Sequence, residues 1–254
     1  MNSPLVSIIM PSFNSSQTIV ETITSIKCQT YDNWELLITD DCSTDLTISL
    51  INEIRLGDER IKLFINEKNS GAAVSRNNSI NAAQGEFIAF LDSDDLWEEN
   101  KLESQLNWML QNDNISFSFT AYQLINENGH LLNKVVDLQG NGKSFSYRDM
   151  LFKKATLGCS TVMLRRSAFR EIQMPLIRTG QDYALWLNLL KNSAEAYLHN
   201  EVLTKYRIMP DSISRNKLKK SKRQWQIYRE IEKLPVWYAV ICFISYSWRA
   251  INRR

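Results

Sequence analysis

The chain has 254 residues, of which 44 % are hydrophobic and 23 % are charged. These values are typical of a globular protein and exclude a disordered or fibrous chain. The four cysteines form no Cys-x-x-Cys pair and only two histidines are present, which argues against a disulfide framework, a zinc ribbon or a multi-histidine metal centre. The N-terminal residues lack a cationic leader and a cleavage site, so we expect no signal peptide.

The net charge of +2 hides an asymmetry along the chain. Residues 205–254 contain 13 Lys and Arg but 3 Asp and Glu, so this segment carries a net charge of +10 and residues 1–204 carry −8. A basic tail on an acidic body predicts attraction to an anionic surface, either membrane lipid or nucleic acid.

The first hundred residues alternate between apolar runs and helical patterns. We expect strands at residues 5–10, 34–39, 60–65 and 87–91, and helices at residues 15–29, 45–54 and 71–83. Apolar strands separated by helices predict an α/β fold with a mostly parallel central sheet flanked by helices. In such sheets ligands bind outside the carboxyl ends of the strands, where polar residues cluster in this sequence.

The remainder of the chain is less regular. Residues 100–110 and 182–190 have helical spacing, residues 115–124 and 161–165 resemble strands, and residues 126–142 are rich in turn formers and are interpreted as a hairpin. A helical pattern begins at residue 214 and is interrupted at Pro235. Residues 235–246 are apolar nearly all round, but they are too few to cross a bilayer, which takes about 20 residues.

The segment Asp92-Ser93-Asp94-Asp95 directly follows the fourth expected strand. Its three carboxylates repel one another unless a cation is present, and oxygen ligands select a hard ion such as Mg²⁺ or Mn²⁺. A site for a metal ion and a diphosphate is one interpretation. A solvated turn that caps the next helix is the other.

Two further segments are candidates for nucleotide contacts. Asp40 and Asp41 end the second strand, where a carboxylate can accept hydrogen bonds from a ribose or a base, or can belong to a helix cap. Small residues around Gly71 would let a ligand approach the backbone. Arg76 follows them and can pair with a phosphate or form a structural salt bridge.

Asp182 opens the helical pattern at residues 182–190, within Gln181-Asp182-Tyr183. A carboxylate at the start of a helix is often a cap. At the mouth of an acidic cleft it can instead act as a general base.

Five motifs, taken in this order, resemble those of family 2 glycosyltransferases: Pro11-Ser12-Phe13-Asn14, Asp40-Asp41 to Asp45, Asn69 to Asn77, Asp92-Ser93-Asp94-Asp95, and Gln181-Asp182-Tyr183 to Trp186. The resemblance covers roughly residues 4–215. It implies a GT-A fold, a nucleotide-sugar donor and inverting transfer. The catalytic domain would then be residues 1–213, with a nucleotide-sugar half at about 1–98 and an acceptor half at about 99–213, followed by a basic amphipathic helical tail at 214–254.

The resemblance also implies roles for individual residues. The residues that would contact the nucleotide-sugar are Pro11, Asn14, Asp40, Asp41, Gly71, Arg76, Asp92 and Ser93. Asp94 and Asp92 would hold Mn²⁺ or Mg²⁺, and Asp182 would be the catalytic base. The residues that would lie at the acceptor, or behind those that touch the substrates, are Asp95, Trp97, Gln181 and Tyr183.

Two positions depart from the family pattern. Gln181 stands where the family often has Glu, and we expect activity to survive this change. Met209 stands where the family often has a histidine near the diphosphate, which removes a candidate third protein ligand to the metal.

The tail resembles the end of bacterial O-antigen transferases of this family. That resemblance implies transfer of glucose or galactose from a UDP-sugar to an N-acetylhexosamine on polyprenyl diphosphate. The product would be β-linked, with a β1,3 linkage favoured. It would be part of the O-antigen of lipopolysaccharide or of a related surface polysaccharide. The enzyme would be peripheral at the cytoplasmic face of the inner membrane, with the tail as a membrane-associating helical extension on anionic lipid.

Several alternatives stay open from the sequence. The tail could pack on the catalytic domain or on a second copy in a homodimer. The protein could be a non-enzymatic membrane-associated adapter, or a family 2 transferase with another nucleotide-sugar and acceptor. Nucleic acid is not expected as a partner because the body is acidic. A sugar nucleotidyltransferase and a dehydrogenase are not favoured because the glycine-rich loops of those enzymes are absent.

Overall fold

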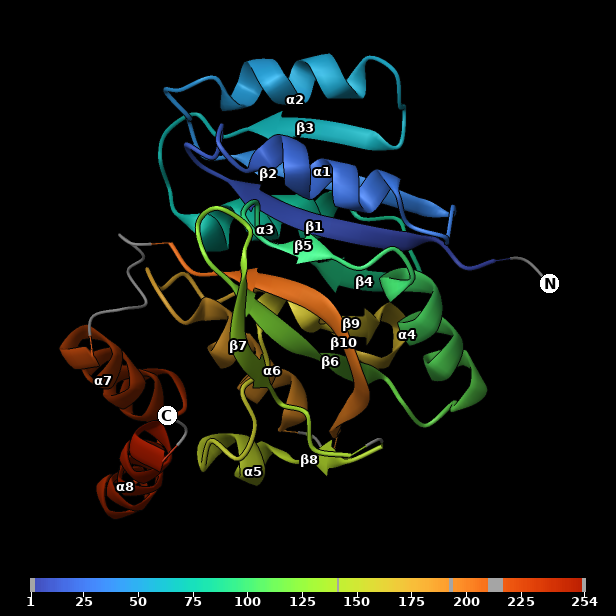
Figure 1. Cartoon of the computed structure of the whole chain (residues 1–254). Coiled ribbons are helices and arrows are strands. Elements are labelled where there is room, and N and C mark those ends of the chain that lie inside the picture. Colours follow the sequence, from blue (N-terminus) through green and yellow to red (C-terminus); the bar gives the residue numbers. More distant parts are fainter. Residues whose placement is uncertain (1–2, 141, 192–193, 210–216, 253–254) are drawn as a thin grey trace.

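The computed structural model describes residues 3–140, 142–191, 194–209 and 217–252 (Figure 1). Its centre is a ten-stranded mixed sheet in which most of the strands in the N-terminal half run parallel. The α/β class and the largely parallel sheet flanked by helices are confirmed.

The N-terminal half has the strand order β3-β2-β1-β4, with every neighbouring pair parallel. Its elements are β1 (Val6–Ser12), α1 (Ile19–Lys27), β2 (Trp34–Asp40), α2 (Thr47–Arg55), β3 (Ile61–Ile65), α3 (Ala72–Ala82) and β4 (Phe87–Phe90). All seven were expected from the sequence, within a few residues at their ends. The apolar runs made the strands recognisable because they are buried on both faces.

The second half continues the sheet in the order β9-β6-β10-β5 and adds antiparallel pairs. Its elements are β5 (Leu96–Trp97), α4 (Lys101–Gln111), β6 (Phe117–Ile125), β7 (Leu131–Val136), β8 (Ser144–Phe145), α5 (Tyr147–Leu151), β9 (Met163–Arg165), α6 (Gln181–Leu190) and β10 (Ala196–Arg207). A hairpin was expected within residues 126–142, but the observed one pairs β6 with β7, so it begins earlier in the chain and residues 126–130 form its turn. The sequence did not indicate β5, β8, α5 or the long strand β10.

Successive residues of β1 point into two different cores, as the period of two in a strand requires. Ile8 and Met10 pack with α1 and α2, whereas Ile9 packs with α3 and the acceptor-half residues around Trp186. The sheet is therefore covered on both faces. Polar loops follow the carboxyl ends of its parallel strands.

The C-terminal segment consists of α7 (Lys217–Gln226), a π-helical turn at Ile227–Ile231, and α8 (Val236–Asn252). Tyr228 donates from its hydroxyl to the Leu151 carbonyl at 2.6 Å. Lys191 forms an ion pair with the buried Glu232 at 3.1 Å. One side of this segment is therefore built into the body, where Tyr228 joins the core around Trp186.

The opposite side of α8 is exposed, with Trp237 67 % and Trp248 69 % accessible. Residues 235–246 were expected to be apolar nearly all round. In the structure one apolar face of this segment is buried against the body and the other is exposed. No helix in the described ranges is both long and apolar enough to cross a membrane.

Candidate active site

A cavity of about 690 Å³ opens at the carboxyl ends of β1, β2 and β4. We call it the donor cavity. It brings together most of the residues that the sequence singled out for the nucleotide-sugar and the metal, namely Pro11, Asn14, Asp41, Arg76, Asp92, Ser93 and Asp94. Met209, the residue that departs from the family pattern, also lines it.

Asn14 joins the loop after β1 to the loop after β2. It has a positive φ of 47°, a conformation that asparagine tolerates better than most residues. Its side-chain oxygen accepts a hydrogen bond from the Thr44 amide at 2.9 Å, and its own amide donates to the Ser43 hydroxyl at 2.8 Å. These bonds fix one wall of the donor cavity.

The two neighbouring carboxylates at the end of β2 have different surroundings. Asp40 is fully buried and accepts hydrogen bonds from the amide and hydroxyl of Ser43, at 2.7 and 2.6 Å. It is not among the residues that line the donor cavity, so it closes the turn after β2. Asp41 lines the cavity and accepts from the amides of Ser70 and Gly71, at 2.8 and 2.7 Å.

Gly71 serves this network through its backbone. Its φ of 89° is strained for residues with a side chain, and it lets the amide point at Asp41 just before α3 begins. Gly71, like Asp40, was expected at the nucleotide and is not among the residues lining the cavity.

Arg76 and Asp92 form an ion pair at 2.5 Å across the floor of the cavity. Burial disfavours the charged guanidinium, but Asp92 and the nearby Asp182 raise the pKa of Arg76 above its usual value. The Nε atom of Arg76 is buried and has no hydrogen-bond partner among the described residues. The structural salt bridge is therefore confirmed, and Arg76 also lines the donor cavity.

The carboxylates that follow β4 have separate environments. Asp95 is buried and accepts from the Ser160 hydroxyl at 2.5 Å and the Arg207 amide at 2.8 Å. Burial, together with Asp94 and Asp92, raises the pKa of Asp95 well above its usual value. Asp94 lines the donor cavity, and burial together with Asp92 raises its pKa to about 6.

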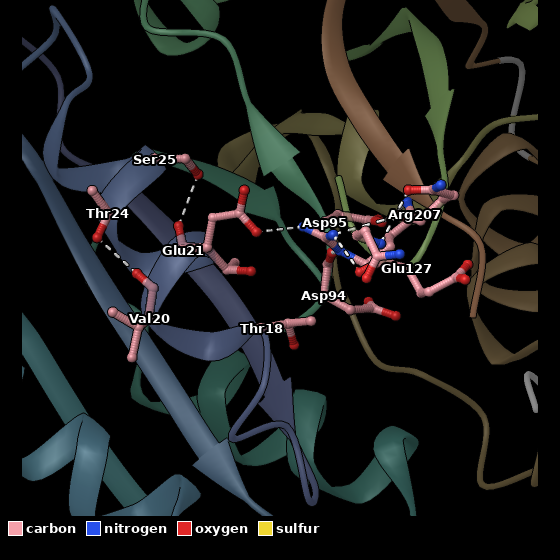
Figure 2. A network of polar contacts seen from close by, with 12 residues as sticks. Thr18, Val20, Glu21, Thr24, Ser25, Asp94, Asp95, Glu127 and Arg207 are labelled. Atoms are coloured by element: carbon pink, nitrogen blue, oxygen red, sulfur yellow. Dashed lines mark hydrogen bonds and ion pairs between the residues drawn. The ribbon is translucent and has the colours of Figure 1, made fainter. Parts of the chain in front are cut away.

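Arg207, at the end of β10, forms hydrogen bonds with this acidic loop (Figure 2). Its Nε donates to the Asp94 carbonyl at 2.7 Å, and its two terminal nitrogens reach the Glu127 carbonyl at 3.0 Å and the Glu21 carboxylate at 2.6 Å. One buried guanidinium thus connects β10, α1 and the turn of the β6–β7 hairpin to the acidic loop. Sequence reasoning missed it because these partners are distant along the chain.

Among the described residues, no group of three or more His, Cys, Asp or Glu side chains surrounds a single metal position. Asp94 and Asp92 are both at the donor cavity, but Asp92 is already paired with Arg76.

A second cavity, of about 250 Å³, lies next to the first and shares Asp92 with it. We call it the acceptor cavity. Asp182 and Tyr183, in the first turn of α6, line it, and the Tyr183 hydroxyl donates to the Met150 carbonyl at 2.8 Å. Its other lining residues include three cations from outside the sequence motifs, Lys153, Lys220 and Arg223.

Two residues expected at the acceptor side lie behind the cavities. Trp97 is buried and donates from its indole nitrogen to the Ser160 carbonyl at 2.8 Å, so it supports the serine that binds Asp95. Gln181 is buried at the start of α6 and is not among the lining residues.

The family model described as "Glycosyl transferase family 2" matches residues 7–173. The putative teichuronic acid biosynthesis glycosyltransferase TuaG of Bacillus subtilis is 45 % identical over 99 % of this chain and 98 % of its own length. The Escherichia coli protein named UDP-Glc:alpha-D-GlcNAc-diphosphoundecaprenol beta-1,3-glucosyltransferase WfgD is 44 % identical over 93 % of this chain and 90 % of its own length.

Solved structures show the same GT-A-like fold. Staphylococcus aureus TarS 1-349 in complex with UDP-GlcNAc superposes with a TM-score of 0.72 at 18 % identity, covering 98 % of this chain and 72 % of that one. The mannosyltransferase PcManGT from Pyrobaculum calidifontis, in complex with GDP-Man and Mn²⁺, gives a TM-score of 0.70 at 16 % identity, covering 96 % and 70 %.

The raised pKa of Asp94 predicts a pH-dependent gain in stability when its charge is removed. A carboxyl with a folded-state pKa of about 6 destabilises the fold as the pH rises from its usual value near 3.8 through 6. We expect Asp94→Asn, without added metal, to unfold at a Tm roughly 2–4 °C above that of the unaltered protein at pH 8, which corresponds to about 1 kcal/mol. The difference should vanish near pH 4, as calorimetric scans at both values would show. A difference independent of pH would contradict this account.

Proposed function

The chain belongs to glycosyltransferase family 2, and we propose that it transfers a hexose from a UDP-sugar to an N-acetylhexosamine carried on polyprenyl diphosphate. The observation that carries this proposal is the adjacency of the two cavities, which share Asp92 and of which the second is lined by Asp182. The name of the Escherichia coli relative supports a UDP-hexose donor, a lipid-linked diphosphate acceptor and a β1,3 linkage, with glucose favoured over galactose.

The proposed reaction is a single displacement. The acceptor hydroxyl attacks the anomeric carbon from the face opposite the leaving UDP, so an α-linked donor gives a β-linked product. Asp182 accepts the hydroxyl proton, a role usually worth about 10²–10⁴ in rate. The cavity positions of Arg76 and Asp41 suit contacts to the diphosphate and the nucleoside, respectively.

We also propose that Asp94, with Asp92 beside it, holds Mn²⁺ or Mg²⁺ when the donor binds. The fit rests on the Asp94 carboxylate in the donor cavity, where burial and repulsion by Asp92 disfavour its charge until a cation is added. With few protein ligands, the ion would take the others from phosphate and water, as Mg²⁺ commonly does. A bound ion would neutralise charge on the leaving diphosphate.

The exposed face of α8 supports a peripheral position on a membrane, at the cytoplasmic face of the inner membrane as the resemblance implies. Its large exposed apolar side chains are Val236, Trp237, Val240, Ile241, Ile244 and Trp248. They recur at helical spacing, with two tryptophans, which are residues suited to the interface between lipid and water. The buried side of the same helix is anchored to the body, so α8 would lie flat on the surface.

Replacing the proposed base separates transfer from donor binding. We expect Asp182→Asn to lower the transfer rate by at least about 10²-fold while the calorimetric affinity for UDP, measured with Mn²⁺, stays within about twofold. Asp113→Asn, which removes an exposed carboxylate after α4, is the control and should leave both quantities unchanged. Unchanged turnover in Asp182→Asn would remove this residue from the mechanism. Failure of every UDP-sugar with the unaltered enzyme would overturn the assigned donor.

The membrane proposal makes a second prediction. Burying a tryptophan removes 150–250 Å² from water at about 25 cal/mol per Å², so a double variant Trp237→Gln/Trp248→Gln should bind anionic phospholipid vesicles at least about tenfold more weakly. Leu176→Gln removes an equally exposed apolar side chain from the body and should bind as the unaltered protein does. Flotation of all three with vesicles would measure this. Equal flotation of the double variant would contradict a membrane role for α8.

A further inference from the structure

Three cationic side chains line the acceptor cavity. Lys220 and Arg223 come from α7 and Lys153 from the loop after α5. All three line the same cavity as Asp182. The basic tail therefore contributes directly to the candidate active site.

We propose that Lys220 and Arg223, with Lys153, form an anion subsite that binds the diphosphate of the lipid-linked acceptor beside Asp182. This inference rests on the proposed function and names the part of the acceptor that the chain recognises. It assigns α7 a place in substrate binding, in addition to any contact of the tail with a membrane.

The position of Arg223 is fixed by close packing. A Cβ on Gly180 would lie 2.8 Å from the Arg223 Cδ and 3.0 Å from its Nε, so Arg223 can occupy this position because residue 180 has no side chain. Gly180 is the N-cap of α6 and lies two residues before Asp182. The guanidinium stem thus crosses the start of the helix that carries the proposed base.

α7 is held against the body strongly enough to act as a wall of the cavity. Gln224 and Ile227 are buried, and the π-helical turn that follows buries Tyr228 under α5. The Tyr147 hydroxyl and Lys191 both contact the buried Glu232 carboxylate, at 2.5 and 3.1 Å. These contacts come from α5 and from the C-terminal end of α6, the helix whose first turn lines the cavity.

The cations of α7 share the acceptor cavity with the carboxylates of Asp92 and Asp182 without pairing with them. In the described part of the chain neither Lys220 nor Arg223 forms an ion pair, and the half-buried Lys220 has a pKa lowered by burial and by Arg223. The Lys153 ammonium lies 3.3 Å from the centre of the Tyr183 ring. An anion entering the cavity would relieve the repulsion between the two α7 cations.

The chemistry of an acceptor diphosphate matches this arrangement. Among the described residues, three cations and two carboxylates line the acceptor cavity, whereas one cation and three carboxylates line the donor cavity, so the acceptor cavity is the more favourable of the two for a second anion. A guanidinium can bind two phosphate oxygens at once, and an ammonium adds a point charge. Because the acceptor sugar is attached directly to its diphosphate, binding the diphosphate on the α7 side would bring that sugar toward Asp182 and the donor.

The test compares acceptors rather than enzymes alone. Water-soluble short-chain acceptors carrying the same N-acetylhexosamine on a diphosphate, on a monophosphate or on a neutral alkyl group are assayed first without vesicles and then with anionic vesicles. For the diphosphate acceptor we expect Lys220→Gln and Arg223→Gln each to raise KM by about 10- to 100-fold, with the donor KM within twofold. The KM for the neutral acceptor should change little in either variant. Lys222→Gln removes an exposed cation from the same helix and should change none of these values.

Several outcomes would overturn the subsite. An equal loss on all three acceptors would indicate a structural role, a rise in the donor KM alone would indicate contact with UDP, and an effect seen only with anionic vesicles would indicate lipid headgroups. If the enzyme transfers no sugar, that result would count against the proposed function itself. A binding measurement then still tests the subsite. Calorimetric titration of Arg223→Gln with the diphosphate acceptor should then show at least tenfold weaker binding than the unaltered protein. Equal affinity would overturn the subsite.

Discussion

The crowding of three carboxylates after β4 is the constraint around which the site is arranged. Like charges within four residues are costly in a partly buried loop, and the raised pKa values of Asp94 and Asp95 express that cost. Two buried guanidinium groups offset it, because Arg76 pairs with Asp92 and Arg207 donates to the Asp94 carbonyl. Because Arg207 also contacts α1 and the β6–β7 hairpin, the same compensation draws distant segments to the site.

The charged residues on the two sides of Asp92 are mostly of opposite sign. Asp94 and Asp41 line the donor cavity together with Arg76 and suit a cation and a nucleoside, while Lys220 and Arg223 line the acceptor cavity together with Asp182. The charge asymmetry of the sequence thus has a local meaning, since part of the basic tail faces the acidic body across a cavity. The exposed apolar face of α8 lies on the far side of the same segment and is free to meet another surface.

The sequence alone was sufficient for the N-terminal half of the fold because β1, β2 and β4 are buried on both faces and read as apolar runs. The sequence was less informative where tertiary contacts determine the secondary structure. Strand β10 mixes buried and half-exposed positions and is interrupted by register shifts, so no regular period marks it.

Site residues followed the same division. Most motif residues at the strand ends line the donor cavity. Asp40 and Gly71 do not, and instead form hydrogen bonds within the loop after β2 and between that loop and the start of α3. Arg207 and the cations of α7 belong to no local motif and gain their positions only through folding. The sequence pattern also did not indicate the π-helical turn at Ile227–Ile231.

The central claim is a single displacement with Asp182 as the base, and the stereochemistry of the product tests it most directly. The enzyme would be incubated with an α-linked UDP-hexose, Mn²⁺ and an N-acetylhexosamine-diphosphate acceptor, and the anomeric proton coupling of the new linkage would be measured by nuclear magnetic resonance. We expect a β-linked product. An α-linked product would require retention at the anomeric carbon and would contradict the single displacement.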